Sequence, residues 1–197
     1  ALKYEKAGVK RFSFVTSGRK LSDLDFSKVL SLCVEIKNKT RLSLCVSSSF
    51  LSKEQLTELK NAGVTKYHHN LETGPRFFDK ICTTHSFKDK VETIEKCNEL
   101  GLQVCSGGIF GLGESLDDRI EMALELKRLK VKSIPINILK PIKGTPLENM
   151  PRLSKEETLL SIAIFRIINP KATIIIAAGR PFLTKDENLT LLKSGVN

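Results

Sequence analysis

Residues 86–109 read SFKDKVETIEKCNELGLQVCSGGI. The hydroxyl of Ser86 stands three residues before the carboxyl of Asp89, and apolar side chains then recur at helical spacing. Gly101 lies where the C-terminus of a helix needs positive φ, and a strand-like run follows it at 102–109. The stretch therefore predicts a helix that leads directly into a buried strand.

Strand-like and helix-like segments alternate along the rest of the chain. Runs rich in Val, Ile and Leu, with little strict alternation, predict parallel strands buried on both faces. These runs lie at residues 10–15, 41–47, 64–71, 102–109, 133–139 and 172–177.

The helices between these strands carry their own start signals. Ser52, Ser115 and Ser154 each stand three residues before an acidic or amide side chain, which is typical of a helix N-cap. One predicted helix has an apolar face of Leu116, Ile120, Ala123 and Leu124. The helix over 159–168 is apolar nearly all round, so we expect it to be deeply buried.

Alternating strands and helices predict an α/β fold with a parallel sheet, formed as one domain over residues 1–197. An open doubly wound sheet and a (β/α) TIM-type barrel both fit. The sequence provides about six βα units, whereas a complete eight-unit barrel needs roughly 250 residues. A barrel would therefore be incomplete. In either architecture, a functional site is expected at the C-terminal ends of the strands.

The amino-acid composition limits which classes of partner the protein is expected to bind. The chain has 197 residues, of which 41% are hydrophobic and 27% charged, as in a globular domain. The net charge is +10, yet the lysines are scattered and aromatics make up 6%, which favours a solvated surface over nucleic-acid binding. Attraction of anionic small molecules fits the charge equally well. No apolar run is long enough for a membrane span, and the first residues do not show the basic-then-apolar pattern that predicts a secretory leader.

The five cysteines indicate a reducing, cytoplasmic setting. Their number is odd and no two form a C-x-x-C pair, which argues against a disulfide framework or a zinc site built from sequence neighbours.

The densest group of polar side chains is YHHNLET at residues 67–73, after a predicted strand. If the strand continues to residue 71, alternation sends Asn70 and Glu72 to the same side. A carboxylate there can accept ribose hydroxyl hydrogens, and an amide can both donate to and accept from a urea group. The alternative is a strand end whose polar groups cap the following turn.

A second unusual stretch, CSGGIFGLGE, occupies residues 105–114. Glycines allow a ligand to approach the backbone closely, although the spacing differs from the dinucleotide-binding G-x-G-x-x-G pattern. A strand that offers backbone groups to a flat base and a tight strand-to-helix turn ending at Ser115 are equally good interpretations.

Four further positions are ambiguous from their patterns alone. Asn137 stands in an apolar strand, where a structural network and a substrate contact are similarly plausible. Arg180 ends another strand and suits an anion or a surface salt bridge. Cys45 and Cys105 lie at or near equivalent strand ends, but buried cysteines are usually inert.

Taken together, several of these motifs resemble the biotin synthases of the radical S-adenosylmethionine (SAM) superfamily. The likeness runs from about Gly8 to Gly195, and the motifs that carry it are residues 67–73, 104–114, 133–139, 144–147 and 178–180. The glycine stretch also resembles the G-x-I-x-G-x-x-E element of other radical SAM enzymes. The resemblance implies strands two to seven of a (β/α)8 barrel.

The resemblance also implies a reaction. A [4Fe–4S] cluster would reductively cleave SAM, and the 5′-deoxyadenosyl radical would remove hydrogen from the substrate, dethiobiotin. Sulfur from an auxiliary iron–sulfur cluster would then close the thiophane ring, which completes biotin biosynthesis. The implied electron donor is a protein such as flavodoxin or ferredoxin, and a homodimer is compatible with the resemblance.

Individual residues take implied roles by their position in the shared motifs. SAM-binding positions are Glu72 for the ribose, Lys90 near the methionyl carboxylate, and Gly107, Gly108, Ile109 and Gly111 for the adenine element. Asn70 and Asn137 match amides that bind the ureido ring of dethiobiotin, and Cys45, Cys105 and Arg180 match ligands of the auxiliary cluster.

Two departures from the family pattern weaken this interpretation. The chain contains no C-x-x-x-C-x-x-C motif for the radical-generating cluster, so the isolated chain is not expected to be an active enzyme. Ser13 stands where many members have a third auxiliary-cluster cysteine, which leaves the type of that cluster open. The rival hypotheses are another radical SAM enzyme, such as one like a hydrogenase maturase or methylornithine synthase, and a cluster-free module that binds a small ligand.

Overall fold

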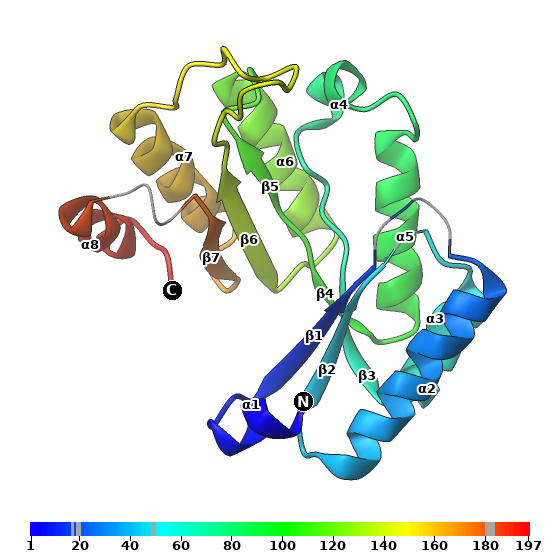
Figure 1. Ribbon diagram of the computed structural model, residues 1–197. Coiled ribbons are helices and arrows are strands. Elements are labelled where there is room, and N and C mark those ends of the chain that lie inside the picture. Colours follow the sequence, from blue (N-terminus) through cyan, green and yellow to red (C-terminus); the bar gives the residue numbers. More distant parts are fainter. Residues whose placement is uncertain (17, 19–20, 49, 180–183) are drawn as a thin grey trace. The chain divides into compact units, whose positions relative to one another are not determined.

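The computed structural model describes residues 1–16, 18, 21–48, 50–179 and 184–197. These residues form two compact units, and Figure 1 shows strands alternating with helices in each. The first unit contains residues 1–69 and 89–104, and the second contains residues 70–88 and 105–197. Strand pairs in both units are parallel, which confirms the α/β class.

The first unit contains a parallel sheet with helices against it. Its elements are α1 (Leu2–Lys6), β1 (Arg11–Val15), α2 (Asp23–Lys39), β2 (Ser43–Ser47), α3 (Lys53–Asn61), β3 (Val64–His68), most of α5 (Phe87–Glu99) and the start of β4 (Gln103–Cys105). β2 pairs with β1 on one side and β3 on the other. Leu44, Val46 and Leu56 have no exposed surface and form part of its core.

The predicted caps of the first unit are present. Ser52 accepts a hydrogen bond from the backbone N–H of Gln55, whose side chain bonds back to the N–H of Ser52, so α3 begins with a full capping box. Gly101 follows α5 with a φ of 69°, as predicted for a helix C-terminus, and Gly63 follows α3 in the same way with a φ of 93°.

His68, at the end of β3, makes the stability of the first unit depend on pH. Burial, and then the nearby charges of Lys66 and Lys90, lower the pKa of His68. The folded state therefore keeps the imidazole neutral, whereas the unfolded chain protonates it near its ordinary pKa of about 6.5. Stability from this group is present above that pH and is lost as the pH falls.

We expect the free energy of unfolding to drop more between pH 7.5 and 5.5 in the parent protein than in His68→Gln. Urea denaturation at the two pH values measures this difference. An equal drop in both proteins would show that another group causes the pH dependence.

The second unit holds the remaining strands and helices. They are α4 (Pro75–Ile81), β5 (Gly108–Phe110), α6 (Leu116–Arg128), β6 (Ser133–Ile138), α7 (Lys155–Ile168), β7 (Thr173–Ala178) and α8 (Lys185–Lys193). β6 lies between β5 and β7, and the last residue of β4, Cys105, pairs with Ser133 at the start of β6. Ile134 and Ile136 of β6 are fully buried.

The expected continuous strand at 102–109 is wrong, because it is divided into β4 and β5. The interruption falls at Ser106 and Gly107. There the backbone N–H of Gly107 bonds the side chain of Asn70, and the Gly107 carbonyl accepts from Glu72 N–H. These bonds to residues 70–72 take the place of a regular strand ladder.

The predicted buried faces of two helices need correction. On α6 the buried stripe is Arg119, Met122, Ala123 and Leu126, whereas Leu124 is 50% exposed. α7 is not buried all round, since Ile167 is 77% exposed. Its buried stripe, Thr158, Ser161, Ile162 and Phe165, follows the i, i+3, i+4, i+7 spacing of one face, because α7 packs beside α6 on a single side.

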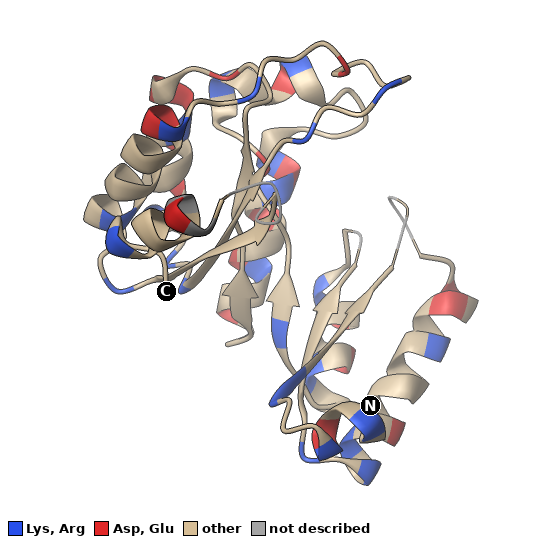
Figure 2. Cartoon of the chain, turned by 60° about the vertical axis from the view of Figure 1, so that its left-hand side comes forward, with Lys and Arg blue, Asp and Glu red and all other residues tan. Residues whose placement is uncertain are grey.

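Charged residues in each unit are distributed among helices and loops. Figure 2 shows lysine and arginine interspersed with acidic residues along most helices. Such mixing agrees with the predicted solvated surface. Among the described residues, no helix combines the length and apolar character that crossing a membrane requires.

Candidate functional site

Two segments that are distant in sequence are held together by backbone hydrogen bonds in the second unit. Glu72 N–H donates to the Gly107 carbonyl at 3.1 Å, and Ile109 N–H donates to the Glu72 carbonyl at 2.8 Å. The polar stretch after β3 and the glycine stretch before β5 therefore form one structure. We call residues 70–73 and 106–109 the clasp.

The two clasp glycines are required by close packing. A β-carbon on Gly107 would meet the carbonyl oxygen of Pro135 in β6. A β-carbon on Gly108 would meet the Glu72 carbonyl and would lie 2.6 Å from Sδ of Met122. Neither position has space for a larger residue, so these glycines let the backbones approach each other.

Two side-chain amides bond to the glycine pair, one through its oxygen and the other through its nitrogen. Asn70 Oδ1 accepts from Gly107 N–H at 3.1 Å, and Asn137 Nδ2 donates to the Gly108 carbonyl at 3.3 Å. Because backbone groups fix both amide orientations, Asn70 presents its NH₂ and Asn137 presents its carbonyl for further bonding. A cyclic urea has a carbonyl oxygen that accepts and N–H groups that donate, so it could bond to both amides.

Glu72 has an unusual backbone. Its φ of 74° lies in the left-handed region, which few residues other than glycine adopt. The prediction that the strand continues to residue 71 is wrong, because β3 ends at His68. The simple alternation argument for Asn70 and Glu72 therefore does not apply. Backbone bonds of the clasp, rather than strand geometry, bring them to the glycine pair.

Buried hydroxyls also lie on the clasp. Oγ1 of Thr73 and Oγ of Ser106 are buried and have no hydrogen-bond partner among the described residues. Buried polar atoms are usually hydrogen-bonded, so a binding partner at these positions would satisfy them. Together with the backbone cradle at Gly107 and Gly108 and the half-buried carboxyl of Glu72, they fit a polar ligand such as a nucleoside.

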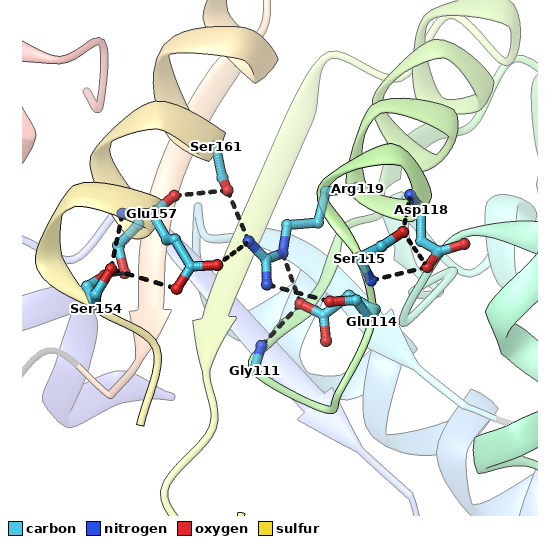
Figure 3. Close-up of polar contacts among 9 residues, drawn as sticks. Gly111, Glu114, Ser115, Asp118, Arg119, Ser154, Glu157 and Ser161 are labelled. Atoms are coloured by element: carbon cyan, nitrogen blue, oxygen red, sulfur yellow. Dashed lines mark hydrogen bonds and ion pairs between the residues drawn. The ribbon is translucent and has the colours of Figure 1, made fainter. Parts of the chain in front are cut away.

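The glycine turn after β5 is fixed by a buried ion pair (Figure 3). Glu114 Oε1 accepts from Gly111 N–H at 2.8 Å and from Arg119 Nε at 2.7 Å. Both side chains are at least 97% buried, since they expose 1% and 3% of their surface. Gly111 has a φ of 94°, which the turn requires.

Arg119 links this turn to α7. Its Nη1 donates to Ser161 Oγ at 3.2 Å and lies 3.9 Å from Glu157 Oε1 (Figure 3). Its guanidinium carbon also lies 5.6 Å from the centroid of the Phe110 ring. The positions of Arg119, Glu157 and Ser161 in this network were not predicted. The sequence signal that could have revealed Arg119 is its helical spacing from Met122 and other apolar residues.

The remaining predicted site residues lie in different places. Lys90 is in the first unit, where its Nζ lies 5.5 Å from the centroid of the Phe50 ring. Cys45 is buried in the middle of β2, rather than at a strand end, and pairs in register with Ser13 of β1. Cys105 ends β4 in the second unit and contacts Ser133 Oγ at 3.3 Å. Arg180 lies outside the described residues.

The donor set does not form a metal centre within the described parts of the chain. No group there of three or more His, Cys, Asp or Glu side chains is arranged to hold a metal ion. Since the sequence also lacks C-x-x-x-C-x-x-C, these residues do not fit a [4Fe–4S] cluster of the radical SAM type.

Comparison with solved structures gives the fold. Methylornithine synthase superposes with a TM-score of 0.82 at 19% identity, covering 97% of this chain and 56% of that protein. HydG, a maturase of the [FeFe]-hydrogenase, gives a TM-score of 0.83 at 16% identity, covering 99% of this chain and 46% of that one. These matches confirm an incomplete (β/α) barrel and disfavour the doubly wound alternative. At such low identity they show the fold alone.

Curated relatives confirm the resemblance to biotin synthases. The biotin synthase of Clostridium tetani is 55% identical over 173 residues, or 88% of this chain and 53% of the relative. That of Campylobacter hominis is 55% identical over 194 residues, or 98% of this chain and 60% of the relative. The chain therefore spans somewhat more than half the length of these relatives.

Family profiles divide the sequence in two. The Biotin and Thiamin Synthesis associated domain matches residues 135–197. The Radical SAM superfamily profile matches residues 1–126, which is more than half of the chain. The chain therefore belongs to the radical SAM superfamily.

Proposed function

We propose that this chain forms much of the SAM and dethiobiotin pocket of a biotin synthase, which inserts sulfur into dethiobiotin in the cytosol. The observation that carries the proposal is the clasp, where Asn70 and Asn137 offer one donor and one acceptor beside the glycine pair. Its chemistry matches a cyclic urea beside a nucleoside. The identities of about half with biotin synthases support it independently.

Each of these residues has its own task in the proposal. Glu72 accepts hydrogen bonds from the ribose hydroxyls of SAM, and the backbone at Ile109 borders the adenine. Lys90 attracts the methionyl carboxylate, although a lysine lacks the bidentate fork of an arginine. Asn70 donates to the ureido carbonyl, and Asn137 accepts from a ureido N–H.

Iron–sulfur chemistry completes the proposed reaction. A [4Fe–4S] cluster would supply the electron that cleaves SAM, and its cysteine ligands are not in this sequence. Cys45, Cys105 and Arg180 remain the proposed ligands of an auxiliary cluster, with flavodoxin or ferredoxin as the electron donor. No disulfide joins the cysteines of the described residues, which supports a reducing cytosol as the place of action.

Turnover of the complete gene product tests the proposal. The protein, reconstituted anaerobically with iron and sulfide, is given SAM, a reductant and dethiobiotin, and biotin is measured by mass spectrometry. Biotin formation is the expected result. The rival, another radical SAM enzyme, predicts SAM cleavage without biotin and a different small substrate.

Glu72→Gln should weaken SAM binding. The substitution keeps the shape but replaces a charged acceptor with a neutral amide, and hydrogen bonds to charged groups contribute about 1.5–3 kcal/mol. We expect the Kd for SAM to rise about tenfold or more in isothermal titration calorimetry.

Glu125→Gln serves as the matched control. Glu125 lies on α6 and pairs with the exposed Arg128 rather than with a clasp residue. Its Kd for SAM should equal that of the parent protein. An unchanged Kd in Glu72→Gln would remove Glu72 from the proposed SAM site.

A further inference from the structure

The segment that follows α4 brings a thiol and an imidazole into contact. Sγ of Cys82 lies 3.4 Å from Nδ1 and 3.6 Å from Nε2 of His85. Thr84 Oγ1 lies 2.9 Å from Nδ1 of the same ring and 3.5 Å from Sγ of Cys82. The ring of Phe78 contacts His85 edge-on, with 5.6 Å between centroids. Two side chains besides the thiol therefore hold the imidazole in place.

This group is accessible from the surface. A shallow cavity of about 480 Å³ is lined by Asp79, Cys82, Thr83, Thr84, His85 and Ser86. The thiols of Cys33, Cys45 and Cys97 are buried, whereas Cys82 and Cys105 are partly exposed. Burial raises the pKa of Cys33 to about 11 and that of Cys97 to about 12. Those two thiols therefore stay protonated and unreactive at neutral pH.

Charged groups also lie near the pair. Asp79, on α4, is the carboxylate among the cavity-lining residues, and a carboxylate near an imidazole favours its protonated form. The C-terminal end of α4 also favours a cation nearby. Of the neighbouring lysines, Lys80 lies over the Phe77 ring at 5.3 Å, and Lys88 follows at the start of α5. The positive charges of the two lysines favour a thiolate at Cys82, whereas the C-terminal end of α4 disfavours it.

We propose that Cys82 and His85 form a reactive thiol–imidazole pair that exchanges with small disulfides. In this step the Cys82 thiol gives its proton to His85, and Sγ attacks one sulfur of a disulfide R–S–S–R. The Sγ–S bond forms as the S–S bond breaks, and the leaving thiolate takes the proton from His85. The disulfide is the oxidant, and the products are a mixed disulfide on Cys82 and one free thiol. This proposal does not depend on the assigned SAM or dethiobiotin roles.

Tryptic mapping of the complete gene product tests the pair. Cleavage after Lys80 and Lys88 releases ICTTHSFK, in which Cys82 is the sole cysteine. The native protein is incubated with oxidised glutathione, and samples are taken over time from pH 6 to pH 9. We expect glutathionylation of this peptide to proceed well before that of residues 29–37, which carry the buried Cys33.

His85→Gln should slow the reaction most at low pH. An imidazole that accepts the proton of the thiol raises the thiolate fraction at low pH, although a more acidic thiol is also a weaker nucleophile. The net loss expected in His85→Gln is about fivefold at pH 6, shrinking toward none near pH 9. Thr83→Ala, in the same cavity, is the matched control and should react like the parent protein.

Thr84→Ala provides a second test in case His85→Gln alters the local fold. It removes only the hydroxyl at Nδ1 of His85 and should give a smaller loss with the same pH dependence. Unchanged reactivity of the Cys33 peptide reports that each variant is folded. The proposal is overturned if the pH profile of Cys82 modification is the same in the parent, His85→Gln and Thr84→Ala, or if Cys82 reacts no faster than Cys33.

Discussion

Arg119→Met should be among the most destabilising single substitutions in this chain. It leaves the Glu114 carboxylate buried without its cation, while Oε2 of that group already lacks a hydrogen-bond partner among the described residues. Breaking a buried ion pair by removing one partner costs about 3–5 kcal/mol. Urea denaturation followed by circular dichroism should show a loss of that size.

The same helix offers a matched control. Arg128 also lies on α6 and also pairs with a glutamate, at 2.7 Å from Glu125, but 53% of its side-chain surface is exposed. Arg128→Met should cost less than about 1 kcal/mol, because exposed pairs contribute little. Adding Glu114→Gln to Arg119→Met removes the stranded charge and should recover part of the loss. Equal effects of the two arginine substitutions would contradict the buried-pair argument.

Gly107→Ala should damage both stability and ligand binding. The new methyl group would meet the Pro135 carbonyl and force β6 away from the clasp. Overpacking of this kind costs about 3 kcal/mol when the neighbour is backbone and cannot move aside. SAM and dethiobiotin binding should fall together, since the displaced backbone carries the bonds from Asn70 and Glu72.

Gly144→Ala is the matched control, because it introduces backbone strain without the steric crowding expected in Gly107→Ala. Gly144 has a φ of 82°, and a β-carbon there would meet nothing within 4 Å. Alanine at this position should therefore cost only about 1 kcal/mol of conformational strain, with ligand binding unchanged. If Gly107→Ala behaves like this control in denaturation and in calorimetry, the clasp is not as tightly packed as described.

Much of the fold could be predicted from local signals. Capping pairs such as Ser115 with Asp118 mark where helices begin, because the bonds they make span only three residues. Gly63 and Gly101 mark two helix ends for the same local reason. Helix α4 was missed, although Pro75 directly after Gly74 is a recognised start signal.

Long-range contacts could not be predicted in the same way. The division of 102–109 into two strands depends on Asn70, 37 residues before Gly107. The buried face of α6 includes Arg119, whose partner Ser161 is 42 residues away. A rule based on apolar periodicity assigns a charged residue to the surface, so it placed Ala123 correctly on the buried face but left out Arg119 and included the exposed Leu124.

In the candidate site, too, residue types could be predicted from the sequence, whereas the backbone geometry could not. Residue types in YHHNLET and CSGGIFGLGE indicated a polar site, and the structure brings Asn70, Glu72 and Asn137 to the same glycine pair. The left-handed backbone at Glu72 had no sequence signal, because glutamate rarely adopts it. Roles for these side chains stay predictions until binding is measured.

The left-handed backbone at Glu72 affects the thermodynamics of ligand binding. Glu72 is held at a φ of 74° by bonds from its own N–H to Gly107 and from Ile109 N–H to its carbonyl. The unfavourable conformation is therefore imposed when the chain folds, and an arriving ligand does not have to impose it. Such preorganisation lowers the entropy lost on association, at the expense of a less stable apoprotein.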